Sequence, residues 1–371
     1  MKAKRRRGNI PGSTERHERS RVSRAQPDRA VSEETRTKLS TLQAQLGDLQ
    51  ESLLLTPVEN EVEEIRTTLS LLSPRIKELR TRGYVFRSFL ENKVRVLDKQ
   101  WDETHEDISR KVRRHTTDLR READEAERAL RDAMGGGTTP ISRAEAAITA
   151  LEQKVDAAQA STRAAYATLQ QNVSQTEAQI AQIEWLLEEV DEASFPLYPA
   201  EDPVTGCKAQ LMETKKEGPK GVLYLTDERL IFEQKEKVAT KKVLFIATEK
   251  EQVQKLIFEV PIGQVEEATA SQKGFLGHKE VLELLFTPEA DVDSALLHVR
   301  GADSEDWARL IGRVKSGEIA KERTHPKDEE ALETVRATPT RCPTCGAALD
   351  VEIVRGMREV TCEYCGSVVR L

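Results

Sequence analysis

Apolar residues recur every three or four positions between residues 32 and 192, a spacing that places them on one face of a helix. A series from Val58 to Leu79 keeps its phase across Pro74, so either one helix kinks there or Ser73 caps a new one. We therefore expect long coiled-coil helices over this segment. The first leucine series consists of Leu39, Leu42, Leu46, Leu49 and Leu53.

A glycine turn divides the helical segment. Gly135, Gly136 and Gly137 cost too much backbone entropy for a helix interior, and Thr139-Pro140 is a favourable helix start. The arms 84–134 and 141–192 are nearly equal in length, so we expect them to pack antiparallel. The sequence leaves open whether this rod binds partners, oligomerises or only spaces two ends.

The leucine series of residues 32–55 also needs cover. It must be buried either on this hairpin or on a second copy of the chain, so self-association through the coiled coil stays open.

The pattern changes after Ser194. Short apolar runs bounded by turn residues or charges predict seven strands. An amphipathic helix follows over residues 303–314, with Trp307, Leu310 and Ile311 on its apolar face. The predicted strands are 207–213, 221–226, 229–234, 242–248, 255–260, 278–286 and 294–300.

One hairpin of this segment resembles the central hairpin of GRAM domains. Residues 221–232 read G-x-Φ-Φ-Φ-T-x-x-R-Φ-x-F, where Φ is apolar, with a turn at Thr226-Asp227-Glu228. The seven strands, the closing helix and Trp307 resemble the pleckstrin-homology (PH) layout. The resemblance implies a seven-stranded PH-like β-barrel with a C-terminal helix over residues 194–316, in a multidomain α+β protein.

Members of this group bind proteins or phosphoinositides. In lipid-binding members, basic residues between the first two strands hold phosphates, which here implies Lys215, Lys216 and Lys220 as candidate lipid contacts. However, residues 200–316 contain 17 basic and 21 acidic side chains, whereas a membrane-facing domain normally carries positive charge. We therefore favour protein docking over phospholipid binding.

The C-terminal residues 342–371 contain a metal-binding pattern. Cys342-x-x-Cys345 and Cys362-x-x-Cys365 are separated by sixteen residues, and each pair precedes a glycine suited to positive φ. Four thiolates fill the coordination sphere of a structural zinc ion, Zn²⁺. Redox dithiols and a rubredoxin-like iron site are the alternatives.

The same residues predict a small hairpin. We expect a zinc ribbon whose arms are 351–354 and 358–361, turning at 355–357. It resembles the small ribbons that close many bacterial multidomain proteins. Residues 317–341 form a charged linker, with a short helix predicted at 328–336.

The remaining charge and cysteine patterns bear on location. Residues 1–31 hold ten basic and three acidic side chains, which predicts a disordered basic tail that is either solvated or touches nucleic acid or anionic lipid. Cys207 has no predicted partner, so a reducing compartment fits. The sequence shows neither a secretory signal nor an apolar run long enough to span a bilayer, so we expect a cytoplasmic protein, peripheral to membranes if it binds lipid.

These patterns favour a non-enzymatic cytosolic adaptor or scaffold. The sequence has no phosphate-binding glycine loop, nucleophile elbow or H-E-x-x-H motif, so no enzyme is expected. A peripheral membrane protein is the first alternative, and a nucleic-acid-associated protein is the second. The ribbon carries three arginines against four acids, which argues against nucleic-acid contact through it.

Overall fold

The computed structural model describes most of the chain after residue 32. The predicted basic tail 1–31 and the candidate contacts Lys215 and Lys216 lie outside the described residues. The chain divides into two compact units, residues 1–56 with 112–160, and residues 57–111 with 161–371. The described residues are 33–212, 217–243, 246–273, 279–329, 333, 339–349, 351 and 353–370.

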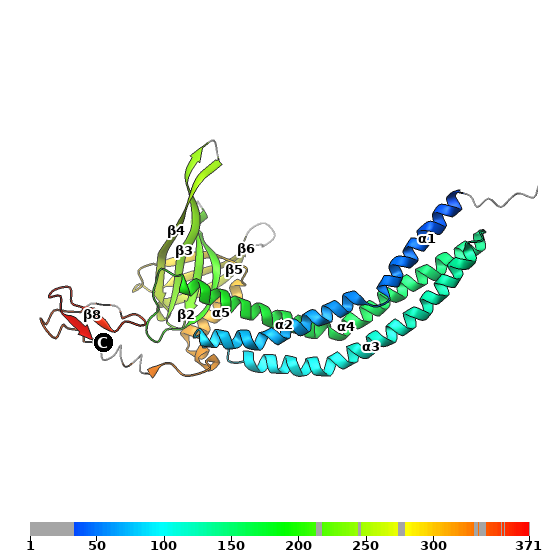
Figure 1. The fold of residues 1–371 in the computed structure, drawn as a ribbon. Coiled ribbons are helices and arrows are strands. Elements are labelled where there is room, and N and C mark those ends of the chain that lie inside the picture. Colours follow the sequence, from blue (N-terminus) through cyan, green and yellow to red (C-terminus); the bar gives the residue numbers. More distant parts are fainter. Residues whose placement is uncertain are drawn as a thin grey trace, which may run out of the picture. The chain divides into compact units, whose positions relative to one another are not determined.

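The first unit is a bundle of three helical segments (Figure 1). Helix α1 lies along the adjoining parts of α3 and α4, where Lys38 pairs with Glu145 at 2.8 Å and the Gln50 side-chain amide donates to Glu127 at 2.6 Å. Leu39, Leu42 and Leu46 of α1 are buried, so helices of the same chain cover this leucine series. The bounds are α1 (Glu33–Ser52), α3 (Leu90–Ala133) and α4 (Thr138–Asp191).

The glycine turn folds α4 back on α3. Gly136 and Gly137 have positive φ values of 76° and 110°, which glycine adopts without strain. Beyond the turn, Lys154 pairs with Glu122 at 2.5 Å. The predicted antiparallel arrangement is therefore confirmed, whereas a coiled-coil supercoil stays a prediction.

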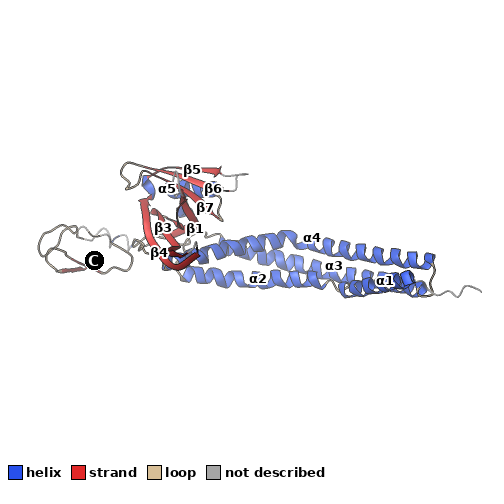
Figure 2. Ribbon diagram, turned by 90° about the horizontal axis from the view of Figure 1, so that it is seen from above, coloured by secondary structure: helices blue, strands red, loops and turns tan. Residues whose placement is uncertain are grey.

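In the second unit, α2 (Thr56–Thr81) and the adjoining parts of α3 and α4 lie side by side (Figures 1 and 2). The Arg75 guanidinium donates to both carboxylate oxygens of Glu184 at 2.8 and 2.7 Å, and Lys93 donates to Gln179 at 3.0 Å. Helix α2 continues through Pro74, which answers the question that the sequence left open. The buried Leu72 and Ile76 on either side of Pro74 supply packing that offsets its lost hydrogen bond.

A seven-stranded antiparallel sheet follows (Figure 1). Its strand order is β4-β3-β2-β1-β7-β6-β5, and β4 and β5 are edges that do not pair with each other among the described residues. The predicted closed barrel is therefore wrong, and the sheet is open. The strands are β1 (Pro203–Met212), β2 (Glu217–Thr226), β3 (Arg229–Val243), β4 (Ile246–Pro261), β5 (Val265–Lys273), β6 (Lys279–Phe286) and β7 (Ser294–Arg300); short 3-10 turns occur at η1 (Ile262–Gln264) and η3 (Glu318–Glu322).

Two strand predictions need correction. The predicted strand 242–248 instead covers the end of β3 and the start of β4, where Val243 pairs with Ile246. The predicted strand 255–260 is only the end of β4, and β5 was missed. Strand β5 escapes sequence analysis because its edge position leaves most of its side chains at least partly exposed, with little apolar alternation.

Helix α5 (Ser304–Lys315) packs on β5 and β6. The Asp303 carboxylate caps it by accepting the Glu305 and Asp306 N–H groups at 2.8 and 3.0 Å. Trp307 is only 5% exposed, which confirms the predicted apolar face. Lys315 donates to the Val265 carbonyl at 2.6 Å, which satisfies an acceptor at the start of β5.

A buried ion pair joins the turn of the β2–β3 hairpin to the segment before β1. Arg229 is 3% exposed and Glu201 is fully buried, and the guanidinium donates to both carboxylate oxygens at 3.0 and 2.8 Å. The Thr226 hydroxyl donates to the same carboxylate at 2.6 Å, and the Tyr198 ring centroid lies 3.7 Å from the Arg229 guanidinium carbon. The T-x-x-R part of the hairpin motif therefore builds this corner.

The ribbon hairpin pairs β8 (Glu359–Thr361) with β9 (Val368–Arg370). The predicted arm 358–361 is largely confirmed, but the predicted partner arm 351–354 is wrong. The next residue, Arg355, donates its N–H to the Leu197 carbonyl at 2.7 Å, so this stretch of main chain runs to the segment before β1. Most of the predicted linker helix 328–336 lies outside the described residues.

Replacing Trp307 with alanine should destabilise the second unit by roughly 3–5 kcal/mol, because a large buried ring is lost and a cavity is left under α5. Chemical denaturation monitored by circular dichroism measures this. The exposed Arg309→Ala on the same helix should change the free energy of unfolding by less than about 0.5 kcal/mol. A loss below about 1 kcal/mol for Trp307→Ala would contradict this packing.

Candidate metal centre and basic loops

The two cysteine knuckles have the same backbone geometry. In each, the first cysteine N–H donates to the carbonyl five residues later, and the glycine N–H donates back to the cysteine carbonyl, at 2.8–2.9 Å. Gly346 and Gly366 have φ values of 75° and 73°, as predicted. Both turns therefore present their cysteines in the same way.

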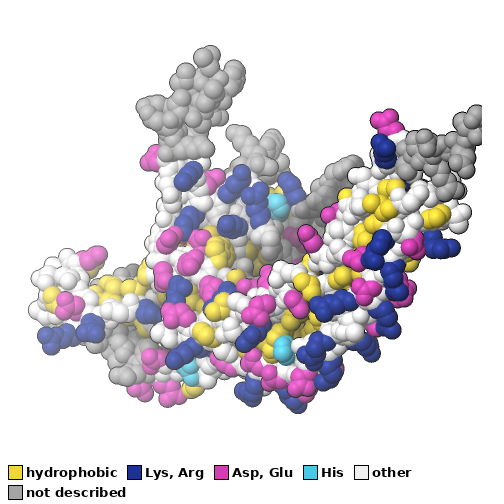
Figure 3. Space-filling view, turned by 45° about the vertical axis from the view of Figure 1, so that its right-hand side comes forward, with side chains coloured by type: hydrophobic (Ala, Val, Ile, Leu, Met, Phe, Trp, Pro, Cys, Tyr) yellow, Lys and Arg dark blue, Asp and Glu magenta, His cyan; other side chains and the backbone are white. Residues whose placement is uncertain are grey.

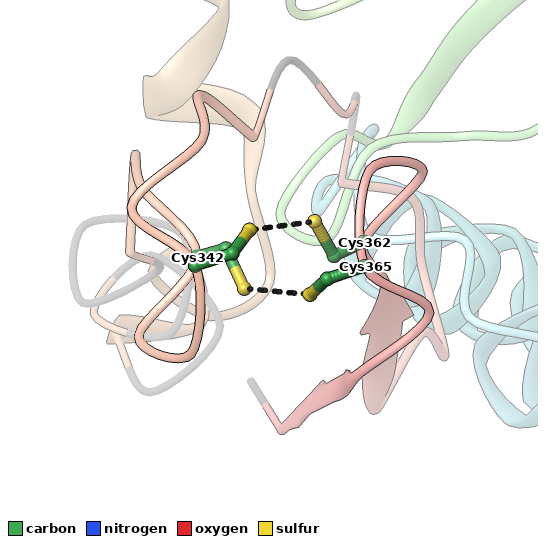
Figure 4. Close-up of side chains that lie close together, drawn as sticks. Cys342, Cys362 and Cys365 are labelled. Carbon is green, nitrogen blue, oxygen red and sulfur yellow. Dashed lines mark hydrogen bonds between the residues drawn. The ribbon is translucent and has the colours of Figure 1, made fainter.

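The four sulfur atoms converge on one point (Figure 4). All lie within 4.8 Å of one another, and the Cys342–Cys365 and Cys345–Cys362 pairs are each 3.7 Å apart. A tetrahedral zinc with Zn–S bonds of about 2.3 Å requires sulfur separations of about 3.8 Å, whereas a disulfide bond is about 2.05 Å long. The spacing therefore fits a four-thiolate metal ion and no disulfide.

Ser367 is a polar neighbour that sequence analysis missed. Its hydroxyl lies 3.2 Å from the Cys342 sulfur and 2.9 Å from the Cys365 sulfur. Hydrogen bonding by Ser367 is the largest cause that lowers the pKa of both thiols, and with hydrogen bonds from the knuckle backbone the pKa of Cys342 falls to about 5. The only sequence signal is an asymmetry, since Ala347 stands at the matching position of the first knuckle.

Cys345 behaves differently. The Ala347 N–H lowers its pKa, but hydrogen bonding with the neighbouring thiols and burial raise the pKa to about 12. Four adjacent thiols do not all ionise unless a cation offsets the accumulated charge. The cluster thus has the donor set of a metal site, and a bound divalent ion would hold all four cysteines as thiolates.

The ribbon is tied to the segment that leads into the sheet. The Arg355 guanidinium donates to the Asp202 carboxylate at 2.9 Å and to the Glu201 carbonyl. Arg323 also pairs with Asp202, and with Asp227 at 2.8 Å. Asp202 therefore links the ribbon to the segment that follows α5.

The candidate lipid lysines do not form a described site. Lys220 is exposed, and its N–H donates to the Glu236 carboxylate at 3.1 Å, while Lys215 and Lys216 lie outside the described residues. Lys235 on the next hairpin is ion-paired with Glu189 and Glu192, both at 2.7 Å. Because Lys235 is already paired with two carboxylates, it is not available to bind an anion at the neighbouring basic loop.

Three further features bear on function. Burial raises the pKa of the Cys207 thiol, which disfavours its reactive thiolate form. Among the described helices, none combines the length and apolarity that a bilayer crossing requires. On the face in Figure 3, acidic and basic side chains are interleaved along the helices.

Comparisons with known proteins give limited similarity. No protein-family model and no curated protein matches the chain. Among solved structures, the N-terminal PH domain of Vps36 matches with 17% identity, 32% coverage of this chain, 82% of that chain and a TM-score of 0.22.

Larger matches come from exchange-factor fragments. The DH/PH domains of p115-RhoGEF match with 15% identity, covering 77% of this chain and 95% of that chain, at a TM-score of 0.21. The DH/PH domains of PDZ-RhoGEF, solved in complex with activated RhoA, match with 9% identity, covering 78% and 96%, at 0.23.

Purified protein should contain one zinc ion per chain, measured by elemental analysis. Cys362→Ser should abolish this zinc and expose the ribbon to proteolysis, because the ribbon is too small to fold without metal. The buried Cys207→Ser is the matched control and should retain zinc. Iron in place of zinc, or full zinc content in Cys362→Ser, would contradict the assignment.

Proposed function

We propose that this chain is a non-enzymatic interaction protein. Its PH-like sheet docks a protein partner, its antiparallel helices present the sheet as a coiled-coil scaffold, and its ribbon is a structural zinc site. The charge arrangement on the sheet and the coordination chemistry of the ribbon support this proposal.

The observation that carries the docking proposal is the state of Lys235. In a lipid-binding loop this cation would face phosphate, but here Glu189 and Glu192 of α4 hold it at 2.7 Å. Burial lowers its pKa, and hydrogen bonding to these carboxylates outweighs that effect, so the net pKa is raised and the lysine stays charged within the fold. The sequence excess of acids over bases in residues 200–316 points the same way.

The open sheet favours a protein partner. Strands β4 and β5 each have only one hydrogen-bonded neighbour among the described strands. Such edges carry backbone donors and acceptors that an extended segment of another protein can pair with. Lys315, at the end of α5, donates to the Val265 and Glu266 carbonyls at the start of β5 and leaves the rest of that edge open to a partner.

The zinc ion would have a structural role. Cys342, Cys345, Cys362 and Cys365 would hold it, and four protein thiolates leave no coordination position for substrate. By ordering the ribbon, the ion would hold Arg355 in position on Asp202. The metal therefore stabilises a joint between the ribbon and the sheet.

The wild-type chain should not sediment with vesicles of phosphatidylcholine containing phosphoinositides at physiological ionic strength, because residues 200–316 carry more acidic than basic side chains and Lys235 is ion-paired. Vesicle co-sedimentation at low and physiological salt measures this, since screening weakens exposed charge contacts. Salt-resistant, phosphoinositide-selective sedimentation would favour the alternative function, a peripheral membrane protein.

If vesicles do bind, two charge-reversal variants show whether the candidate lipid lysines form the binding surface. The triple change of Lys215, Lys216 and Lys220 to Glu should then abolish sedimentation without loss of stability. Lys255→Glu, on exposed β4, is the matched control and should leave sedimentation unchanged.

A further inference from the structure

A cavity of about 550 Å³ lies within the second unit. It is bounded by α4, by the first half of β1 and by the connection from β7 to α5, and it has the size of a small-molecule site. The side chains of Trp185 and Trp307 line it. Gln182 also lines it and donates to the Gly206 carbonyl at 2.6 Å, which fixes α4 against β1.

Three cations line this cavity: Arg87, Lys208 and Arg300. Within the described ranges, none of the three forms an ion pair. The two carboxylates at the cavity are already engaged, since Asp303 caps α5 and Asp306 pairs with Arg309. The cavity lining therefore has an excess of positive charge, whereas Lys235 is paired with two carboxylates.

Two of these cations are placed unfavourably with respect to each other. Lys208 and Arg300 are direct partners across the β1–β7 ladder, so their side chains share one face of the sheet. Like charges directly opposite each other destabilise a sheet. An anion between them would convert this repulsion into two attractions.

The third cation, Arg87, has a strained backbone conformation. Arg87 has φ of 54°, one of two positive values among the described non-glycine residues. The Arg80 guanidinium donates to the Arg87 carbonyl at 3.2 Å and helps to hold this conformation. Such strain persists where the fold requires it, and it is concentrated at binding sites.

A second effect shows that Arg87 contributes to a positive field. Burial lowers the pKa of Lys93, and the charge of Arg87 lowers it further.

We propose that this cavity binds a small phosphorylated organic molecule. Its phosphate lies between Lys208, Arg300 and Arg87, because guanidinium and ammonium groups are the preferred phosphate partners. Its organic part contacts the Trp185 side chain, which offers apolar area. A soluble organic phosphate and a phosphorylated lipid headgroup share this chemistry.

Isothermal titration of the full-length, zinc-loaded chain with ADP and with pyrophosphate tests the proposal. Both should bind saturably, and adenosine, which lacks phosphate, should not. Arg300→Gln should weaken ADP binding by about tenfold or more, because one charge-assisted phosphate contact is lost. Arg87→Gly should have the same effect while keeping the fold, since glycine adopts positive φ without strain.

Two controls keep the result specific. Lys255→Gln removes the same charge from β4, which does not line the cavity, and should bind ADP as the wild type does. Arg300→Gln should unfold at the same temperature as the wild type or higher, because the repulsion with Lys208 is removed. Weak binding in Arg300→Gln with an unchanged or raised melting temperature therefore reports on the site itself.

Binding measurements with phosphoinositide vesicles distinguish a lipid headgroup from a soluble organic phosphate as the ligand. Binding only to phosphoinositide vesicles, with loss in Arg300→Gln, would identify a lipid headgroup as the ligand. The proposal is overturned if ADP, pyrophosphate and vesicles all fail to bind when each supplies phosphate groups at millimolar concentration. It is also overturned if Arg300→Gln and Arg87→Gly bind as the wild type does.

Discussion

The buried pair of Arg229 and Glu201 is the interaction on which the sheet unit depends. Two buried opposite charges are costly to desolvate, and they are tolerated only when their hydrogen bonds are satisfied. Here Glu201 accepts from Arg229, Thr226 and the Tyr198 N–H, and Arg229 also donates to the Pro196 carbonyl and pairs with Glu259. Removing one partner would leave the other charge buried with unsatisfied hydrogen bonds.

This corner also determines where the neighbouring segments attach. Glu201 belongs to the connection between α4 and β1, and its carbonyl accepts from Arg355 of the ribbon. The next residue, Asp202, accepts from Arg323 and Arg355, so the segment after α5 and the ribbon meet beside the same pair. The buried charges of Glu201, Asp202 and Arg229 therefore join neighbouring segments, whereas the cations that line the cavity are exposed or half-buried.

Local patterns predicted the elements well where periodicity and burial coincide. The glycine turn, the helices, the hairpin at Thr226 and the cap at Asp303 follow from nearest-neighbour chemistry. Local patterns do not predict strand β5, because its side chains are largely exposed at an edge. The predicted closed barrel is wrong because strand pairing depends on long-range packing, which local patterns do not encode. The convergence of the four cysteines could be predicted from their spacing alone, since both knuckles are local turns.

The remaining features depend on contacts between distant residues. The Arg229–Glu201 pair spans 28 positions and the Arg355–Asp202 pair spans 153, and no short motif encodes either contact. The cavity cations come from three separate segments, and only the β1–β7 register shows that Lys208 faces Arg300. The left-handed backbone of Arg87 has no sequence signal, because arginine does not favour it.

A double-mutant cycle on Arg229 and Glu201 tests the role of this corner most directly. Denaturation of Arg229→Met, Glu201→Gln and the double variant gives the coupling free energy between the two side chains. Each single change should cost roughly 3–5 kcal/mol, and the double variant should cost clearly less than the sum, because no charge is left buried alone. Additive losses, or single losses below about 1 kcal/mol, would contradict the view that this pair organises the unit.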